Sequence, residues 1–321
     1  MSQEYNEYRS LLKKGSFIEA SRFAERQHLK SDINNPFWLT RQAAALTRAK
    51  NFNKAIEIAK QALSLNPSNP YSVLAVAEAM QGLNRHEEAI RYFEEITDNP
   101  KLSFYSRKGV FNSLLVLKQW DRILELLTRW EMPPDTVYRW KVKALEGKKR
   151  IDEAIEVCRQ WLKADPDNPA GLWSLIGLEI KKDGLKQVLS RMGKIAKIKS
   201  RPPIYKEIYA SLCKKAGKHE LALEQYDKIS LTGSNIWNIR QRAFALAKSG
   251  KEAEAVGLME ELLKTDPTDY FIHTSYKAAC GRLHQPDRVL NFYEKLLELH
   301  PEEQTLLGRI RKVKKELGIE K

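Results

Sequence analysis

A small or medium-sized apolar residue returns about every 34 positions along this chain of 321 residues. A fixed period of this size indicates a stack of one repeated supersecondary unit, in which each unit buries its apolar face against its neighbours. Arrays of this kind present a long surface to a partner. The positions in the series are Ala20, Ala55, Ala89, Ile123, Ala154, Val188, Ala222, Ala255 and Val289.

Each unit contains the pattern of two helices. In the most regular unit, Leu39, Ala43 and Leu46 fall on one helical face, and residues 52–63 supply a second apolar face after a polar turn. Residues 66–70, with the sequence Asn-Pro-Ser-Asn-Pro, end the unit because proline cannot continue a helix and restricts the residue before it. The sequence therefore predicts an array of helix pairs.

Small side chains recur where the two helices of a unit are expected to cross. The paired positions are Ala43 and Ala55, Ala77 and Ala89, Ala210 and Ala222, and Ala243 and Ala255. Together with the closing prolines, these pairs resemble the tetratricopeptide repeat. The resemblance covers residues 1–301 as nine units, which start near residues 1, 36, 70, 104, 135, 169, 203, 236 and 270, and leaves residues 302–321 as a capping helix.

The resemblance implies an all-α, right-handed superhelical solenoid of antiparallel helix pairs that acts as a protein-interaction scaffold or adaptor. Two units depart from the pattern, because Phe111 and Ile123 occupy one crossing and Ile176 and Val188 occupy another. Two bulky residues cannot approach as closely as two alanines, so we expect these helix pairs to be splayed or shifted.

The sequence lacks the residue patterns that several classes of enzyme require. The sequence contains no phosphate-binding loop, nucleophile elbow or dinucleotide fingerprint, and its six histidines are scattered. Cys158, Cys213 and Cys280 lie far apart on apolar helical positions, so we expect them to be buried rather than to bind metal. We therefore predict a protein that is not an enzyme and that uses no cofactor or metal.

Hydropathy and the N-terminal residues bear on location. The sequence has no run of 18 apolar residues, so it predicts no membrane-spanning helix. The first residues also lack the basic and apolar regions of a signal peptide. These features favour a cytoplasmic protein.

Basic residues dominate the chain, whose formal net charge is +14. The resemblance implies that defined positions of each first helix point to a concave groove. Once basic residues at helix ends are set aside, those positions hold more cations than acids. The cations are Arg9, Arg41, Lys108, Arg139, Lys143, Lys214 and Arg240, against Glu78, Glu146 and Glu207. Aromatic residues occupy the second position of five units, at Phe37, Tyr71, Tyr105, Trp237 and Phe271.

We expect partner binding to be centred on units 4 to 6, where the repeat pattern is least regular. The candidate groove residues are Lys108, Asn112, Arg139, Trp140, Lys143 and Trp173. Trp140 and Trp173 are candidates for binding hot spots, since tryptophan and arginine are enriched there. Aromatic residues at helical spacing also pack between repeats, so this second role stays open. The expected partner is a protein or peptide with an acidic or amphipathic segment.

A separate basic patch covers the second helix of unit 6. Lys186, Arg191, Lys194 and Lys197 are expected to face outward, and the dense run between residues 181 and 201 also includes Lys199. Such density attracts phosphates or an acidic protein surface, although a charged helix also keeps an array in solution. The alternative function is therefore that of a nucleic-acid-associated protein. The basic residues between 309 and 315 fit the outer face of a capping helix instead.

Overall fold

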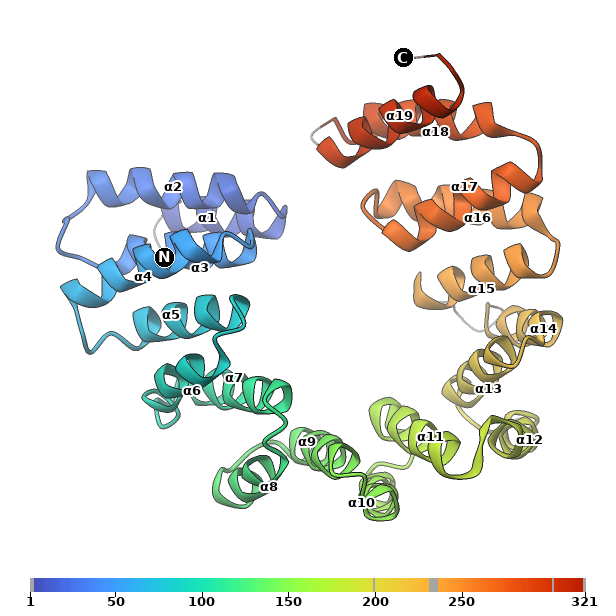
Figure 1. Ribbon diagram of the computed structural model, residues 1–321, viewed down its shortest axis with the longest axis horizontal. Helices are drawn as coiled ribbons and strands as arrows, with labels where there is room; N and C mark the ends of the chain where they lie inside the picture. The colour runs from blue at the N-terminus through green and yellow to red at the C-terminus, as the bar shows by residue number, and fades with distance from the viewer. Residues whose placement is uncertain (1–2, 199, 231–235, 302, 320–321) are drawn as a thin grey trace. The chain divides into compact units, whose positions relative to one another are not determined.

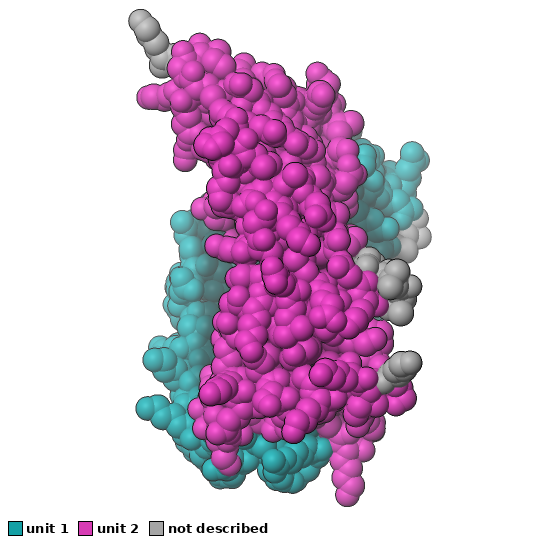
Figure 2. Space-filling model, turned by 90° about the vertical axis from the view of Figure 1, so that its right-hand side faces the viewer, with its two compact units in different colours: residues 1–161 teal, residues 162–321 magenta. Residues whose placement is uncertain are grey.

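The computed structural model describes residues 3–198, 200–230, 236–301 and 303–319. These residues form nineteen helices and no strand, which confirms the all-α prediction (Figure 1). The chain divides into two compact units, residues 1–161 (unit 1) and residues 162–321 (unit 2), which are coloured separately in Figure 2. Each unit is a series of antiparallel helix pairs joined by short turns.

The helices that begin in unit 1 are α1 (Gln3–Lys13), α2 (Phe17–Lys30), α3 (Phe37–Arg48), α4 (Phe52–Leu65), α5 (Pro70–Gly82), α6 (His86–Glu94), α7 (Ser103–Val116), α8 (Trp120–Arg129), α9 (Pro134–Gly147) and α10 (Ile151–Ala164). Unit 2 contains α11 (Pro169–Asp183), α12 (Leu185–Ala196), α13 (Pro203–Lys215), α14 (His219–Ser230), α15 (Ile236–Lys248), α16 (Glu252–Thr265), α17 (Tyr270–Arg282), α18 (Pro286–Leu299) and α19 (Gln304–Glu316). Odd-numbered helices up to α17 are the first helices of their pairs, and even-numbered helices are the second.

A residue with left-handed backbone conformation follows the first helix of every pair in the described part of the chain. These residues are Gly15, Lys50, Asn84, Lys118, Lys149, Gly184, Gly217, Gly250 and His284. Eight of these turns also contain a hydrogen bond that reaches back five residues, such as the 2.9 Å bond from the Asn51 N–H to the Leu46 carbonyl. This arrangement is the Schellman motif, which satisfies helix carbonyls that lack a partner. The turns return with the period seen in the sequence.

The connection between pairs uses the expected proline and a polar cap. The Asn69 side chain accepts hydrogen bonds from the backbone N–H groups of Tyr71 and Ser72, and Pro70 is the first residue of α5. Asp269 accepts in the same way at the start of α17. Such caps satisfy amide donors at a helix start, where proline is also well tolerated.

Side-chain size at the crossing controls how closely two paired helices pack. All eight alanines of the four predicted pairs are fully buried. The helix pairs that contain them, α3–α4, α5–α6, α13–α14 and α15–α16, have the most extensive contacts within pairs. The pairs α7–α8 and α11–α12 contact each other less, as Phe111 and Ile176 led us to expect. The pairs α9–α10 and α17–α18 are also loosely packed, and we had not predicted this.

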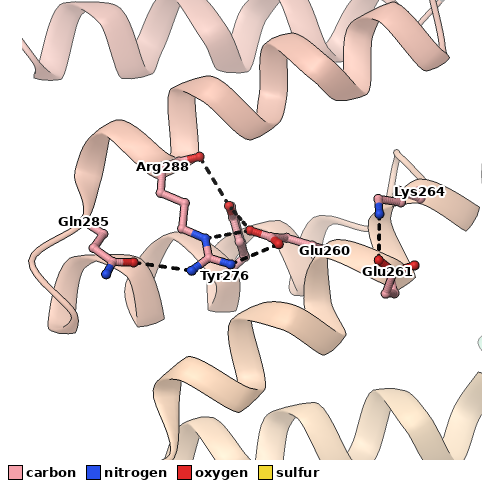
Figure 3. Close-up of polar contacts among 6 residues, drawn as sticks. All are labelled: Glu260, Glu261, Lys264, Tyr276, Gln285 and Arg288. Carbon is pink, nitrogen blue, oxygen red and sulfur yellow. Dashed lines mark hydrogen bonds and ion pairs between the residues drawn. The ribbon is translucent and has the colours of Figure 1, made fainter.

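Polar side chains connect three successive helices within unit 2 (Figure 3). Arg288 of α18 forms two contacts with the carboxylate of Glu260 on α16, from Nε to Oε1 at 2.9 Å and from Nη2 to Oε2 at 3.1 Å. The hydroxyl of the fully buried Tyr276 on α17 donates to the same carboxylate at 2.9 Å. Two-point pairing of this kind fixes the geometry as well as the charge.

The predicted burial of the cysteines is confirmed, since Cys158, Cys213 and Cys280 are all fully buried. Trp161 is a core residue, and its indole N–H donates to Asp135 at 2.9 Å. In α19, Leu306, Ile310 and Val313 are buried in the core of unit 2, while basic residues lie on the exposed side. The expected capping helix was placed at 302–321, and its first residue and last two residues lie outside the described residues.

Candidate protein-interaction surface

The first helices form the inner layer of unit 1. Within the described residues, α3 contacts α5 and α5 contacts α7, whereas α2, α4, α6 and α8 have no comparable contacts with one another. Helices on the inner side of a curved stack approach more closely than those on the outer side, so the first helices line its concave side. We call the accessible side chains of α1, α3, α5, α7 and α9 the first-helix face.

An arginine lies among three aromatic rings on this face. The guanidinium carbon of Arg41 lies 4.2 Å from the ring centre of Phe37, 5.6 Å from that of Tyr71 and 5.7 Å from that of Tyr5. Tyr5, Arg41 and Tyr71 come from three successive first helices. A cation within about 6 Å of an aromatic face is attracted by the ring quadrupole. The rings therefore hold the guanidinium in place.

The backbone beneath this cluster is also fixed. The Tyr8 hydroxyl donates to the Arg41 carbonyl at 2.7 Å, and burial raises the pKa of Tyr8 to about 12. Tyr8 is therefore a neutral donor at physiological pH. Its hydrogen bond connects α1 to α3 directly under the exposed rings.

The aromatic residues around Arg41 remain accessible. Phe37 is 36% exposed, Tyr71 is 38% exposed, and Tyr105, at the equivalent position of α7, is 61% exposed. Within the described residues, Arg41 forms no ion pair with a carboxylate. The face thus offers apolar rings beside a cation without an acidic partner.

Four of the predicted groove residues add to this face. Lys108 and Asn112 on α7, and Arg139 and Lys143 on α9, are all exposed. By the repeat register, Lys108 is equivalent to Arg139, and Asn112 is equivalent to Lys143. In the described part of the chain, Lys108, Arg139 and Lys143 form no ion pair, and the Lys143 ammonium lies 4.9 Å from the centre of the Trp140 ring.

Trp140 does not have the accessible position that we expected. Only 4% of it is exposed, and its ring centre lies 5.2 Å from that of Phe111, which is itself fully buried. Phe111 also contacts Trp130, at 5.4 Å. The bulky residue at the α7–α8 crossing therefore packs between two indoles. Trp140 is a core residue, and its assignment as a partner contact is corrected on this ground.

Trp173, the remaining candidate, lies in unit 2. It is half-buried on α11, with its ring centre 6.2 Å from that of Trp237 on α15. The predicted set is therefore divided, with five members in unit 1 and one in unit 2. The sequence identified Arg41 as a groove cation and Phe37 and Tyr71 as aromatic positions, but their convergence from three helices appears only in the structure.

Unit 2 contains a related cluster whose charge is satisfied differently. Arg240 of α15 lies 5.6 Å from the ring centre of Phe244 and 5.8 Å from that of Phe271, and its Nη2 contacts the Asp269 carboxylate at 3.2 Å. On the neighbouring α13, burial lowers the pKa of Lys214, and the charge of Arg240 lowers it further. Because Asp269 already pairs with Arg240, this cluster offers less free positive charge than the one around Arg41.

The predicted basic patch on α12 is exposed but not entirely free. Lys186, Lys194 and Lys197 are exposed, whereas Arg191 forms an ion pair with Glu179 of α11. Lys199, in the same basic run, lies outside the described residues.

The described residues contain no group of three or more histidine, cysteine, aspartate or glutamate side chains placed to hold a metal ion. None of their helices combines the length and apolar character needed to cross a bilayer.

The described helices define an all-α solenoid of antiparallel helix pairs. Models of the tetratricopeptide repeat match residues 46–100 and 121–169, and the nineteen described helices fit roughly nine such repeats. The chain therefore contains tetratricopeptide repeats in these two segments. Repeats of this family generally mediate protein–protein interactions.

Several solved structures resemble this chain. The tetratricopeptide domain of P58(IPK) is 15% identical, with 98% of each chain covered and a TM-score of 0.31. A structure of Naa15/Naa10 bound to HypK-THB is 10% identical, covers 98% of this chain and 66% of that chain, and has a TM-score of 0.39. The Cut9–Hcn1 hetero-tetramer of the APC/C is 13% identical, covers 97% of this chain and 55% of that chain, and has a TM-score of 0.37. No curated protein matches the sequence.

Proposed function

We propose that this protein is a non-enzymatic scaffold whose first-helix face in unit 1 binds a peptide segment of a partner protein. The segment combines carboxylates with apolar or aromatic side chains. The observation that carries the proposal is the position of Arg41 between the rings of Phe37 and Tyr71, without a carboxylate partner in the described residues. An acidic side chain of the partner would complete this arrangement.

The charge along the face supports an acidic partner. Lys108, Arg139 and Lys143 extend the positive surface from α7 to α9 without ion pairs in the described residues. Of the acids on this face, Glu78 is exposed, but the protein around it reduces its solvation and so raises its pKa, although the charge of Arg48 opposes this shift. A raised pKa means that the charged form of Glu78 is less favoured at this position than in water. The face is thus electrostatically suited to an incoming carboxylate.

The two kinds of side chain have different roles in binding. Exposed cations accelerate encounter with an acidic segment and select against basic ones. Burial of Phe37, Tyr71 and Tyr105 against apolar side chains of the segment would lengthen the lifetime of the complex. Because Arg41 is already oriented by its neighbouring rings, less side-chain entropy is lost when it binds.

A peptide-display selection against the whole protein tests the proposal. We expect enriched sequences to contain acidic and aromatic residues, and synthetic peptides with these sequences to bind Arg41→Ala about tenfold or more weakly, a loss of about 1.4 kcal/mol or more. Arg26→Ala is the matched control, because it removes the same charge from an exposed site on the second helix α2. Equal losses in the two variants would show that net charge, not this face, controls binding.

The same measurements separate the nucleic-acid alternative. If single-stranded oligonucleotides bind more tightly than every selected peptide, and replacing Lys186, Lys194 and Lys197 with glutamine abolishes that binding, the α12 patch is the functional surface. The proposal for the first-helix face would then be wrong.

A further inference from the structure

A basic pocket lies in unit 2 between α17 and α19. It has a volume of about 490 Å³, and its lining includes Tyr270, His273, Lys277, Tyr293, Arg309 and Lys312. Three of these residues are cations, and the lining contains no carboxylate. We call this feature the α17–α19 pocket. It is separate from the face proposed above, which belongs to unit 1.

Arg309 is a half-buried cation in the lining of the pocket. Its Nε atom is buried and has no hydrogen-bond partner in the described residues. On the floor of the pocket, burial lowers the pKa of His273 and the charge of Arg309 lowers it further. Burial raises the pKa of Tyr293, and the charge of Arg309 opposes that shift. Because the Nε atom is shielded from solvent, a ligand in the pocket would be contacted by the terminal Nη groups of Arg309.

Hydrogen bonds on the floor of the pocket are already assigned. The Pro267 carbonyl can only accept, so His273 Nε2 donates to it at 2.8 Å. His273 Nδ1 is therefore the acceptor in the neutral ring and receives the Tyr293 hydroxyl proton at 3.1 Å. Thr274 also donates within the protein, to the Tyr270 carbonyl at 2.8 Å.

The donors left for a ligand are consequently the cations. Lys277 forms an ion pair with Glu316, which removes part of its charge. Arg309 and Lys312 form no ion pair in the described part of the chain. Two free cations and one partly neutralised cation therefore converge on a space with no negative charge in its lining. The electrostatic complement of this set is a group with two negative charges.

We propose that the α17–α19 pocket binds a phosphoryl group, with Arg309 and Lys312 as its principal donors. Arginine presents N–H groups in a planar fork that matches phosphate oxygens, and lysine adds a point charge. Tyr270, which is 64% exposed at the edge of the pocket, offers a ring surface to the organic part of a phosphate ester. A single carboxylate would leave one of the free cations uncompensated.

Titration of the whole protein with inorganic phosphate, phenyl phosphate and acetate, at constant ionic strength, tests this assignment. We expect saturable binding of one phosphate per chain, and acetate binding that is at least about tenfold weaker, since one charge-assisted contact fewer costs about 1.4 kcal/mol or more. Tighter binding of phenyl phosphate than of inorganic phosphate would identify an ester as the ligand, whereas equal binding would identify the free ion.

The variants Arg309→Gln and Lys312→Gln should each weaken phosphate binding about tenfold or more, if each loses a charge-assisted hydrogen bond. Lys312 is exposed, so its replacement should leave folding unchanged. Arg311→Gln is the matched control, because it removes an exposed charge from the same helix but does not line the pocket. Unsaturable binding, acetate binding as tight as phosphate binding, or equal losses in Arg311→Gln and Lys312→Gln would overturn the proposal.

Discussion

The indole of Trp140 packs on the ring of Phe111, with ring centres 5.2 Å apart and planes inclined by 30°. Trp140 belongs to α9 and Phe111 to α7, so this contact connects first helices of successive repeats. Replacing Trp140 with alanine should therefore destabilise the protein by about 3–5 kcal/mol, the usual cost of deleting a large buried aromatic side chain.

The neighbouring Arg139 provides the control for this prediction. It is exposed, so Arg139→Ala should change the free energy of unfolding by no more than about 0.5 kcal/mol. Denaturant unfolding of both variants measures the difference. Wild-type stability in Trp140→Ala would show that the indole is not a core residue.

Gly109 of α7 should tolerate alanine poorly, although alanine favours helix. A Cβ atom at this position would lie 2.5 Å from Phe93 Cε1, and the ring of Phe93 is almost fully buried and has little room to move. We expect Gly109→Ala to lower the melting temperature. At Gly177 of α11 a Cβ would meet no atom within 4 Å, so Gly177→Ala should gain up to about 1 kcal/mol from helix propensity. Stabilisation by both substitutions would contradict the packing at Gly109.

Lys118 has a left-handed backbone conformation, with φ of 56°, in the turn between α7 and α8. A side chain in this conformation costs about 1–2 kcal/mol, whereas glycine adopts it without this penalty. Lys118→Gly should therefore raise the free energy of unfolding by about 0.5–1 kcal/mol, after the greater entropy of the unfolded chain is subtracted. Lys60→Gly, in the middle of α4, should instead lower the free energy of unfolding. Thermal unfolding of the pair distinguishes a turn effect from a general effect of removing lysine.

Tyr276 should contribute to stability through its hydroxyl. Tyr276→Phe keeps the buried ring but removes the hydrogen bond to Glu260, and we expect a loss of about 1 kcal/mol. Tyr105→Phe, at a residue that is 61% exposed, should have no measurable effect. Chemical denaturation measures the stabilities of the two variants. Equal stabilities would contradict a stabilising role of the hydrogen bond between Tyr276 and Glu260.

His273 should make the protein less stable in mild acid. Burial lowers the pKa of His273 below its ordinary value of 6.5, so the unfolded chain binds this proton more readily than the folded chain does. Its contribution is fully present above pH 6.5 and is lost as the pH falls from 6.5 towards the pKa of the folded state. An NMR titration of the His273 ring measures its pKa in the folded protein directly. A midpoint at or above pH 6.5 would contradict the expected loss of stability in mild acid.

The sequence determined the features that recur from one repeat to the next. The period, the crossing alanines such as Ala43 and Ala55, and the prolines between pairs predicted the helices and their packing. The three cysteines were also predicted to be buried, because each occupies an apolar helical position. These features depend on spacing within one or two helices, which the sequence shows directly.

Other features depend on which side chains from different helices meet. Trp140 occupies a position that points to the inner face, yet the bulky Phe111 in the preceding repeat gives it a partner that buries it. Arg41 acquires its aromatic surroundings from α1, α3 and α5, and Arg309 faces a pocket that forms only when α19 packs beside α17. A helical period assigns a residue to a face, but the size and charge of the side chains opposite decide whether that face is core, ion pair or open surface.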